Sequence, residues 1–245
     1  MVNNMVNNNR RTKLFLKILF GQLAVGTLIT VLALSVLFYA QGNRFDFKTF
    51  QTIKTGQISI EYLPRDSQIY INDKRVEVAK SFAKNLSPGW YLFKVAKEGY
   101  TPWQVNLNIA SRSVNIYKNV MLFKSSPQIE VLTDQRKIST LSGPSDQLAS
   151  RGDKNGLFAN GFEIWLDQKI VARFSTQINQ VVWYSDRAHI LYQQGKEIRV
   201  IEKNGMNDTL LATLSKETPT RFAVSSDGVE LYFLDDNTYK VARIR

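Results

Sequence analysis

The segment "SPGWYLFKVAKEGYTPWQVNL" (Ser87–Leu107) carries five aromatic residues between turn signals. It opens with Pro88-Gly89 and is interrupted at Glu98-Gly99, and dipeptides of these types favour turns. Between the two turns, Tyr91 and Phe93 occupy alternate positions, which is the period of a strand with one buried face. The segment therefore predicts two strands, and Tyr91 and Phe93 are assigned to a core.

Alternation of this kind extends on both sides of the segment. Ile58, Ile60 and Tyr62 alternate with polar residues, which predicts a half-buried strand. Asn72-Asp73 separates two short runs of strand-forming residues, and both residue types tolerate a positive φ, so a hairpin turn is expected there. Further alternating runs follow as far as Phe123. From Gly56 onward the chain is predicted to be all-β.

A run of 23 uncharged residues, Ile18–Ala40, precedes these strands. As a helix it would be about 34 Å long, enough to cross a hydrocarbon core of roughly 30 Å. A cleaved signal peptide is one alternative, but its apolar region would be shorter, and "LFYAQG" is a poor cleavage site. A buried helix of a soluble protein is the other, and the basic residues immediately before the run argue against it. The run predicts one uncleaved transmembrane helix over residues 18–40.

The charges around this run predict its orientation. No acidic residue precedes Asp46, whereas four basic residues stand immediately before the run: Arg10, Arg11, Lys13 and Lys17. By the positive-inside bias, the N-terminus stays in the cytoplasm and the following domains are extracytoplasmic. Residues 1–17 are expected to be a basic cytoplasmic tail, with "MVNNMVNNN" disordered, and residues 41–54 a juxtamembrane linker. The predicted location is therefore the cell membrane, with a single pass.

Residues 55–124 resemble a PEGA domain, a small β module of exported bacterial and archaeal proteins. The resemblance rests on Pro64, on "IYINDK", and on Pro88-Gly89 through Gly99-Tyr100. Asp66 and Ser67 stand where the family has Gly-Ala, so the signature tetrapeptide is degenerate. The match covers about a quarter of the chain, from Thr55 to Leu122. It implies a small β-sandwich and a non-catalytic role in the cell envelope.

Residues 125–245 contain an internal repeat. "VVWYSDRAHILYQQGKEIRV" (Val181–Val200) aligns with "FAVSSDGVELYFLDDNTYKV" (Phe222–Val241), so that Asp186 stands opposite Asp227. A weaker third copy places Glu163-Ile164-Trp165 opposite Glu197-Ile198-Arg199. A period near 40 with strand–turn–strand content is typical of propeller blades, and the Ser-Asp corners resemble TolB-like or WD40-like repeats. Each corner aspartate is expected to bond its own backbone.

The length of this region limits its architecture. Closed propellers use about four to eight blades of roughly 40 residues, whereas Ser125–Arg245 has 121 residues. About three blades are expected, forming an incomplete, propeller-like antiparallel region. Its unpaired strand edges and apolar faces must be covered by other protein surface. Three candidates for this cover are the 55–124 module, a second copy of the chain, and another protein. Coverage by the module of the same chain is the preferred hypothesis.

Residue types that support catalysis are scarce. The chain has no cysteine and one histidine, His189, which in the repeat aligns with Glu230 and is interpreted as an ordinary strand residue. A conventional zinc site or Cys-His pair is thereby excluded. Asp235-Asp236-Asn237 is interpreted as a hairpin turn rather than a calcium loop. No catalytic residue, metal or cofactor is predicted.

These features predict a non-enzymatic membrane-anchored binding or scaffold protein, with an envelope protein or cell-wall glycan as partner and with self-association as a further option. The net charge of +11 is scattered beyond the basic flank, so no nucleic-acid partner is expected. A carbohydrate-active hydrolase and an accessory subunit of a secretion or signalling assembly remain as alternatives. Four aromatic residues are candidates for a ligand or partner surface: Trp90, Trp103, Tyr232 and Phe233.

Overall fold

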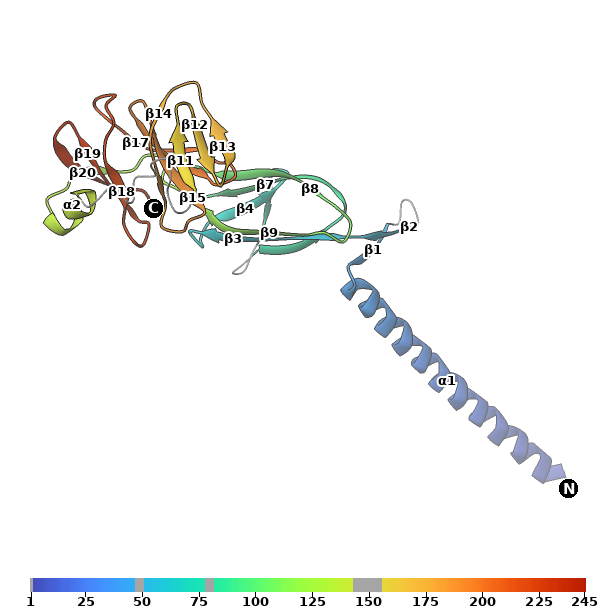
Figure 1. Ribbon diagram of the computed structural model, residues 1–245. Helices are drawn as coiled ribbons and strands as arrows, with labels where there is room; N and C mark the ends of the chain where they lie inside the picture. Colours follow the sequence, from blue (N-terminus) through green and yellow to red (C-terminus); the bar gives the residue numbers. More distant parts are fainter. Residues whose placement is uncertain (1, 47–50, 78–81, 143–155) are drawn as a thin grey trace. The chain divides into compact units, whose positions relative to one another are not determined.

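The computed structural model describes residues 2–46, 51–77, 82–142 and 156–245 (Figure 1). The chain divides into two compact units. The first comprises Met1–Ile58, Ala83–Trp90 and Asn108–Asn115. The second comprises Ser59–Phe82, Tyr91–Leu107 and Ile116–Arg245.

The first unit begins with one long helix, α1 (Val2–Ala40). Its segment Phe15–Ala40 is long and apolar enough to cross a membrane, and none of that segment is buried in the protein. The hydroxyl groups of Thr27, Thr30 and Ser35 donate to carbonyl oxygens four residues earlier, at 2.8–2.9 Å, so these side chains need no other partner. The disordered start expected for the tail is not observed, because the helix already begins at Val2.

The segment expected to be a linker instead contains a small ribbon. Strands β1 (Asn43–Asp46) and β2 (Gln51–Lys54) pair antiparallel, with Asn43 opposite Lys54. The chain leaves the helix through Gly42, whose φ of 75° is left-handed and therefore suits glycine. Where the structure describes residues 41–54, this segment therefore has secondary structure that the sequence did not predict.

The region with the PEGA resemblance consists of strands in two sheets. Their orders are β6-β3-β9 and β5-β4-β7-β8. The predicted inward row is confirmed, since Ile58, Ile60 and Phe93 are fully buried, and Tyr91 is half-buried. The strands are β3 (Gly56–Leu63), β4 (Gln68–Ile71), β5 (Lys74–Val76), β6 (Phe82–Leu86), β7 (Gly89–Ala96), β8 (Trp103–Ile109) and β9 (Val114–Met121).

The predicted turns of this region are also found. Asn72 and Asp73 have φ values of 48° and 62° and join β4 to β5 in a two-residue turn, with Ile71 opposite Lys74. The Pro88-Gly89 turn joins β6 to β7, which belong to different sheets. Gly99, at φ 77°, turns the chain before β8.

Residues 125–245 form three further sheets, and no sheet of the described residues closes on itself. Their orders are β11-β12-β13, β14-β15-β16-β17 and β10-β20-β19-β18. The elements are β10 (Ile129–Val131), α2 (Gln135–Ser142), β11 (Leu157–Asn160), β12 (Glu163–Leu166), β13 (Lys169–Arg173), β14 (Ile178–Trp183), β15 (His189–Gln194), β16 (Glu197–Glu202), β17 (Thr209–Thr213), β18 (Phe222–Val224), β19 (Glu230–Asp235) and β20 (Thr238–Arg243).

The internal repeat seen in the sequence is present in the backbone. Tyr184 N donates to His189 O, and at the equivalent position of the next copy Ser225 N donates to Glu230 O. The corner aspartates behave alike: Asp186 Oδ1 accepts from Ala188 N at 2.8 Å, and Asp227 Oδ1 accepts from Val229 N at 3.0 Å. Strands β14-β15-β16 and β18-β19-β20 are therefore equivalent units, and the predicted self-bonded corners are confirmed.

The segment predicted to be a linker after Ser125 holds two elements. Strand β10 pairs with β20, with Glu130 opposite Val241, and so completes the last sheet. Helix α2 begins after Asp134, whose Oδ1 accepts from Arg136 N at 2.9 Å as an N-cap. The segment is short and polar, so its sequence pattern did not predict the strand or the helix.

The end of the segment 55–124 packs into the repeat region, which is consistent with the preferred hypothesis. Met121 and Phe123 share one buried cluster with Leu231 and Phe233 of β19. The backbone continues this contact, since Lys124 N donates to Ile244 O at 2.9 Å. All of these residues lie in the second unit, so this sheet obtains its apolar cover from the same chain.

Candidate functional site

The candidate site is a cleft of about 640 Å³ in the second unit, lined by both polar and apolar side chains. One wall comes from β7 and β8, and the other from the segment between β16 and β17. Its volume lies within the range of small-ligand pockets, roughly 300–1,000 Å³. The lining residues are Leu92, Lys94, Thr101, Pro102, Gln104, Val105, Asn106, Met206, Asn207, Asp208 and Thr209.

Strand alternation places polar side chains on the first wall. Along β8, Trp103 and Val105 are buried, whereas Gln104 and Asn106 point outward. Lys94 stands on the neighbouring strand β7, between the buried Phe93 and Val95. The side chains of Gln104 and Asn106 make no hydrogen bond to any residue that the structure describes, so these amide groups are available to a ligand.

The second wall is held in place by its own hydrogen bonds. Asn204 Oδ1 accepts from Met206 N at 2.9 Å. Asn207, in the left-handed region at φ 52°, accepts from Gln104 N through its Oδ1 at 3.0 Å. Asn207 Nδ2 donates to Glu202 Oε1 at 3.1 Å. Asn207 therefore links the loop both to β8 and to the end of β16.

Asp208, at the same wall, is neutralised by Arg199. Arg199 Nε donates to both carboxylate oxygens of Asp208 at 3.1–3.2 Å, and its Nη1 donates to Glu197 at 2.7 Å. Partial burial alone would lower the pKa of Arg199, but the hydrogen bonds to Asp208 and Glu197 outweigh burial, and the pKa is raised. The one carboxylate in the cleft lining of the described residues is therefore already paired with a cation.

Trp103 anchors this part of the cleft. Its indole Nε1 donates to Glu202 Oε1 at 2.5 Å, and its ring packs edge-on against Tyr117 with centroids 5.4 Å apart. Glu202 also accepts from Asn204 and Asn207, so its carboxylate has three donors. Burial raises the pKa of Tyr117, and the nearby Glu202 carboxylate raises it further. The anchor is a buried structural contact that positions the two walls.

Three of the four aromatic residues proposed as a ligand surface are buried, so that prediction is corrected for them. Trp103 is 2% exposed, Tyr232 5% and Phe233 0%, and only Trp90, at 66%, faces outward. Strand β19 is covered on both faces, because Leu231 and Phe233 join one buried cluster and Tyr232 joins another. Residues distant in the sequence supply both covers.

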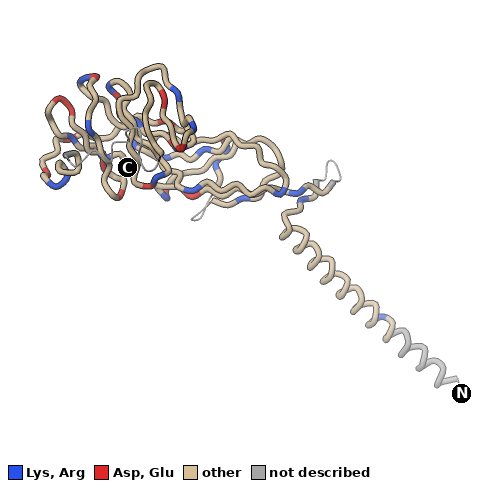
Figure 2. Tube along the Cα trace, in the orientation of Figure 1, with Lys and Arg blue, Asp and Glu red and all other residues tan. Residues whose placement is uncertain are grey.

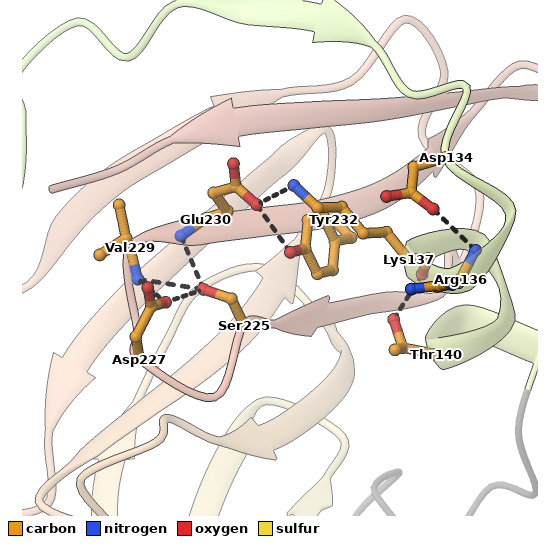
Figure 3. Close-up of polar contacts among 9 residues, drawn as sticks. All are labelled: Asp134, Arg136, Lys137, Thr140, Ser225, Asp227, Val229, Glu230 and Tyr232. Carbon is orange, nitrogen blue, oxygen red and sulfur yellow. Dashed lines mark hydrogen bonds and ion pairs between the residues drawn. The ribbon is translucent and has the colours of Figure 1, made fainter.

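A second polar cluster fixes helix α2 on the last sheet (Figure 3). Lys137 Nζ lies 2.6 Å from Glu230 Oε2, and the Tyr232 hydroxyl donates to the same oxygen at 2.7 Å. Burial, followed by the bond to Glu230, raises the pKa of Tyr232 to about 12. The bond from Lys137, followed by that from Tyr232, lowers the pKa of Glu230. These groups satisfy one another and hold α2 in place.

His189 is a packed strand residue, as the repeat alignment predicted. It is 2% exposed, and its Nδ1 lies 2.7 Å from Asp186 Oδ2. Phe123 and Tyr184 cover its ring edge-on at 5.6 and 5.9 Å. Burial alone would raise the pKa of Asp186, but the bond to His189, its charge and the backbone bonds from Ala188 and His189 together lower it. Among the described residues no cluster of His, Asp and Glu could hold a metal ion.

The remaining predicted positions concern membrane orientation. Lys17 is exposed on α1, and it is the one charged residue in the span Phe15–Ala40 (Figure 2). Arg10, Arg11 and Lys13 lie on the helix backbone, but their side chains are outside the described residues. In the β strands and turns, basic and acidic residues are interspersed (Figure 2).

Sequence reasoning missed the cleft. Gln104 and Asn106 are recognisable in the sequence as the outward positions of a strand. The Met206–Thr209 wall has no such signal, because its position depends on the side chain of Asn207. A scan against models of protein families gives no match for this chain, and a comparison with curated proteins gives none either.

Proposed function

We propose that the chain is a non-enzymatic, membrane-anchored binding protein of the cell envelope. The observation that carries this proposal is the helix span Phe15–Ala40, whose apolar side chains are exposed and therefore need lipid around them. The basic flank ending at Lys17 keeps the N-terminus in the cytoplasm and leaves the β strands outside. The membrane then holds the cleft at the cell surface.

Within this proposal, residues 55–124 are a PEGA-like module and residues 125–245 are about three propeller-like blades. The equivalence of β14-β15-β16 and β18-β19-β20 supports the repeat interpretation. The strand β10, contributed from before the repeats, completes the last sheet in the way that an outer strand completes a propeller blade.

The cleft supports a cell-wall glycan as the ligand. Its polar side chains include the amides of Gln104 and Asn106 and the hydroxyl-bearing Thr101. The Lys94 ammonium also lines the cleft and lies 6.0 Å from the centroid of the Tyr70 ring. Neutral amides and hydroxyls match the alternating donors and acceptors of a sugar polymer. The paired state of Asp208 leaves the cleft without a free acid–base pair, which the hydrolase alternative would require.

A protein partner is the second candidate, on a different surface. Strand β10 is an edge strand, and its Ile129 and Val131 are 42% and 64% exposed. Exposed apolar residues on an unpaired edge favour strand addition by another chain. This surface suits an accessory subunit of a larger assembly.

The full chain in lipid nanodiscs, titrated with soluble peptidoglycan fragments in a calorimeter, tests the glycan proposal. Changing Asn106→Ala together with Lys94→Ala should weaken binding at least about tenfold, the equivalent of about 1.4 kcal/mol. The matched control is Lys169→Ala, which is exposed and outside the cleft. Heat release that is absent from the native chain, or is equal in all variants, would remove the cleft as a glycan site and leave the β10 edge as the binding surface.

A further inference from the structure

The ribbon β1–β2 lies against the last turns of the membrane helix, in the first unit. Phe45, on β1, forms an apolar groove of about 380 Å³ with five residues of α1. Those residues are Val31, Leu34, Ser35, Phe38 and Tyr39. On the same strand, the Arg44 guanidinium carbon lies 5.3 Å from the centroid of the Tyr39 ring. An apolar groove with a cation at its rim thus flanks the end of the span.

Hydrogen bonds fix the connection between the helix and the ribbon. Gly42 O accepts from Thr55 N at 2.9 Å and from Thr55 Oγ1 at 2.8 Å, which ties the end of the helix to the residue that follows β2. A side chain at Gly42 would be strained by its φ of 75° and would approach Thr55 Oγ1 at 3.1 Å. The ribbon is therefore fixed on the helix.

The depth of the groove follows from the length of the span. The 26 residues of Phe15–Ala40 make about 39 Å of helix, roughly 9 Å more than a hydrocarbon core of about 30 Å. Counting about 20 residues from Ile18, just after Lys17, puts the hydrocarbon boundary near Leu37. Phe38 and Tyr39 then stand at the interface, where aromatic residues are favoured. The groove spans this boundary, and its Val31 end reaches into the hydrocarbon.

We propose that the β1–β2 ribbon is immersed in the interface of the membrane and that the groove holds one acyl chain of a phospholipid, with the lipid phosphate against Arg44. The inference rests on the proposed membrane anchor. The apolar lining continues the lipid-facing surface of α1, so the same leaflet supplies the chain. Arg44 provides a positive charge at headgroup depth, where a long basic side chain reaches phosphate while its stem stays in apolar surroundings. The ribbon thereby adds a second membrane contact beside the helix.

The absence of cysteine from the sequence allows one spin label at a time to test this inference. Thr52 is exposed and pairs with Phe45 across the ribbon, so a label at Thr52→Cys reports the depth of the ribbon beside Phe45. A label at Leu34→Cys, on the helix side of the groove, reports the depth of the span. The full chain is placed in nanodiscs of phosphatidylcholine and phosphatidylglycerol, and the accessibility of each label to oxygen and to a water-soluble nickel chelate is compared with that of free nitroxide in buffer.

Both labels should be more accessible to oxygen than to the nickel chelate. Phe45→Ser should shift the accessibility of the Thr52 label toward that of free nitroxide in buffer, whereas Phe45→Leu should not. Arg44→Gln should shift it the same way, with Arg44→Lys as the conservative control. A lipid-exposed Leu34 label with a water-exposed Thr52 label overturns the inference and leaves the anchor intact. A water-exposed Leu34 label overturns both. Spin–spin broadening at Leu34 shows a second copy in the groove instead of lipid, and also overturns the inference.

Discussion

Replacement of Trp103 measures how strongly β8 is held to the end of β16. Trp103→Ala removes a side chain that is 2% exposed, packed on Tyr117 and bonded to Glu202. Truncation of a buried aromatic residue costs about 3–5 kcal/mol in free energy of unfolding. Since whole domains are stable by about 5–15 kcal/mol, this change alone removes a large part of the stability of the second unit.

Trp103→Phe separates packing from the hydrogen bond. The phenyl ring keeps the edge-on contact with Tyr117 but cannot donate to Glu202. A hydrogen bond to a charged group contributes about 1.5–3 kcal/mol. The lower end of that range is expected, because Glu202 retains the amide donors of Asn204 and Asn207 and is not left without partners. The narrower ring adds a small further loss of packing.

Urea unfolding of the full chain in nanodiscs, followed by the β signal in circular dichroism, measures these losses. Combining Trp103→Phe with Glu202→Gln in a double-mutant cycle measures the part of the bond that depends on the carboxylate charge, and the coupling should be about 1 kcal/mol. Distant sites add to within about 0.3–0.5 kcal/mol, so the expected coupling is resolvable. Additive losses for this pair, or a Trp103→Ala variant as stable as the native chain, would refute the assignment of Trp103 as the anchor.

Three further changes test other parts of the structure. Phe93→Ala should cost about 3–5 kcal/mol and Tyr91→Ala less, since Phe93 is fully buried and Tyr91 half-buried; equal melting of both variants and the native chain would contradict the core assignment. The bond from Lys137 lowers the pKa of Glu230. The native chain should therefore have a higher free energy of unfolding than Glu230→Gln at neutral pH, and this difference should disappear as the pH falls below the ordinary range of glutamate. A difference that persists in acid would contradict the pairing. The fragment Ser125–Arg245 should bind a hydrophobic dye, since it lacks the module's two buried residues, and a soluble, cooperatively folded fragment would show that the module is not needed as cover.

Local features of the fold were predictable because their causes are local. Asn72-Asp73 forms a tight hairpin turn because both residue types accept a positive φ, and Asp186 and Asp227 bond to amides two residues later in the chain. The internal repeat of the sequence is matched by equivalent strands for the same reason, because each copy contains its own turn-forming residues. The apolar helix span was predictable from the length and composition of its segment alone.

Features that depend on distant partners were not predictable. The side chains of Trp103, Tyr232 and Phe233 are aromatic residues near turns, and nothing in their neighbourhood indicates that Glu202, α2 or Phe123 covers them. The cleft was missed for the same reason, because one of its walls depends on the link made by Asn207. Aromatic composition alone does not separate a binding surface from a core.

Single-cysteine labelling in living cells tests the central claim, that a membrane anchor holds the β strands outside the cytoplasm. A cysteine at Lys203, which is exposed, should react with a membrane-impermeant maleimide in intact spheroplasts, whereas one at position 3 should react only after lysis. Prior treatment with a permeant maleimide should block both positions. Reaction at position 3 in intact spheroplasts, with protection at Lys203, would reverse the orientation, and reaction at neither before lysis would contradict exposure of the β strands at the cell surface.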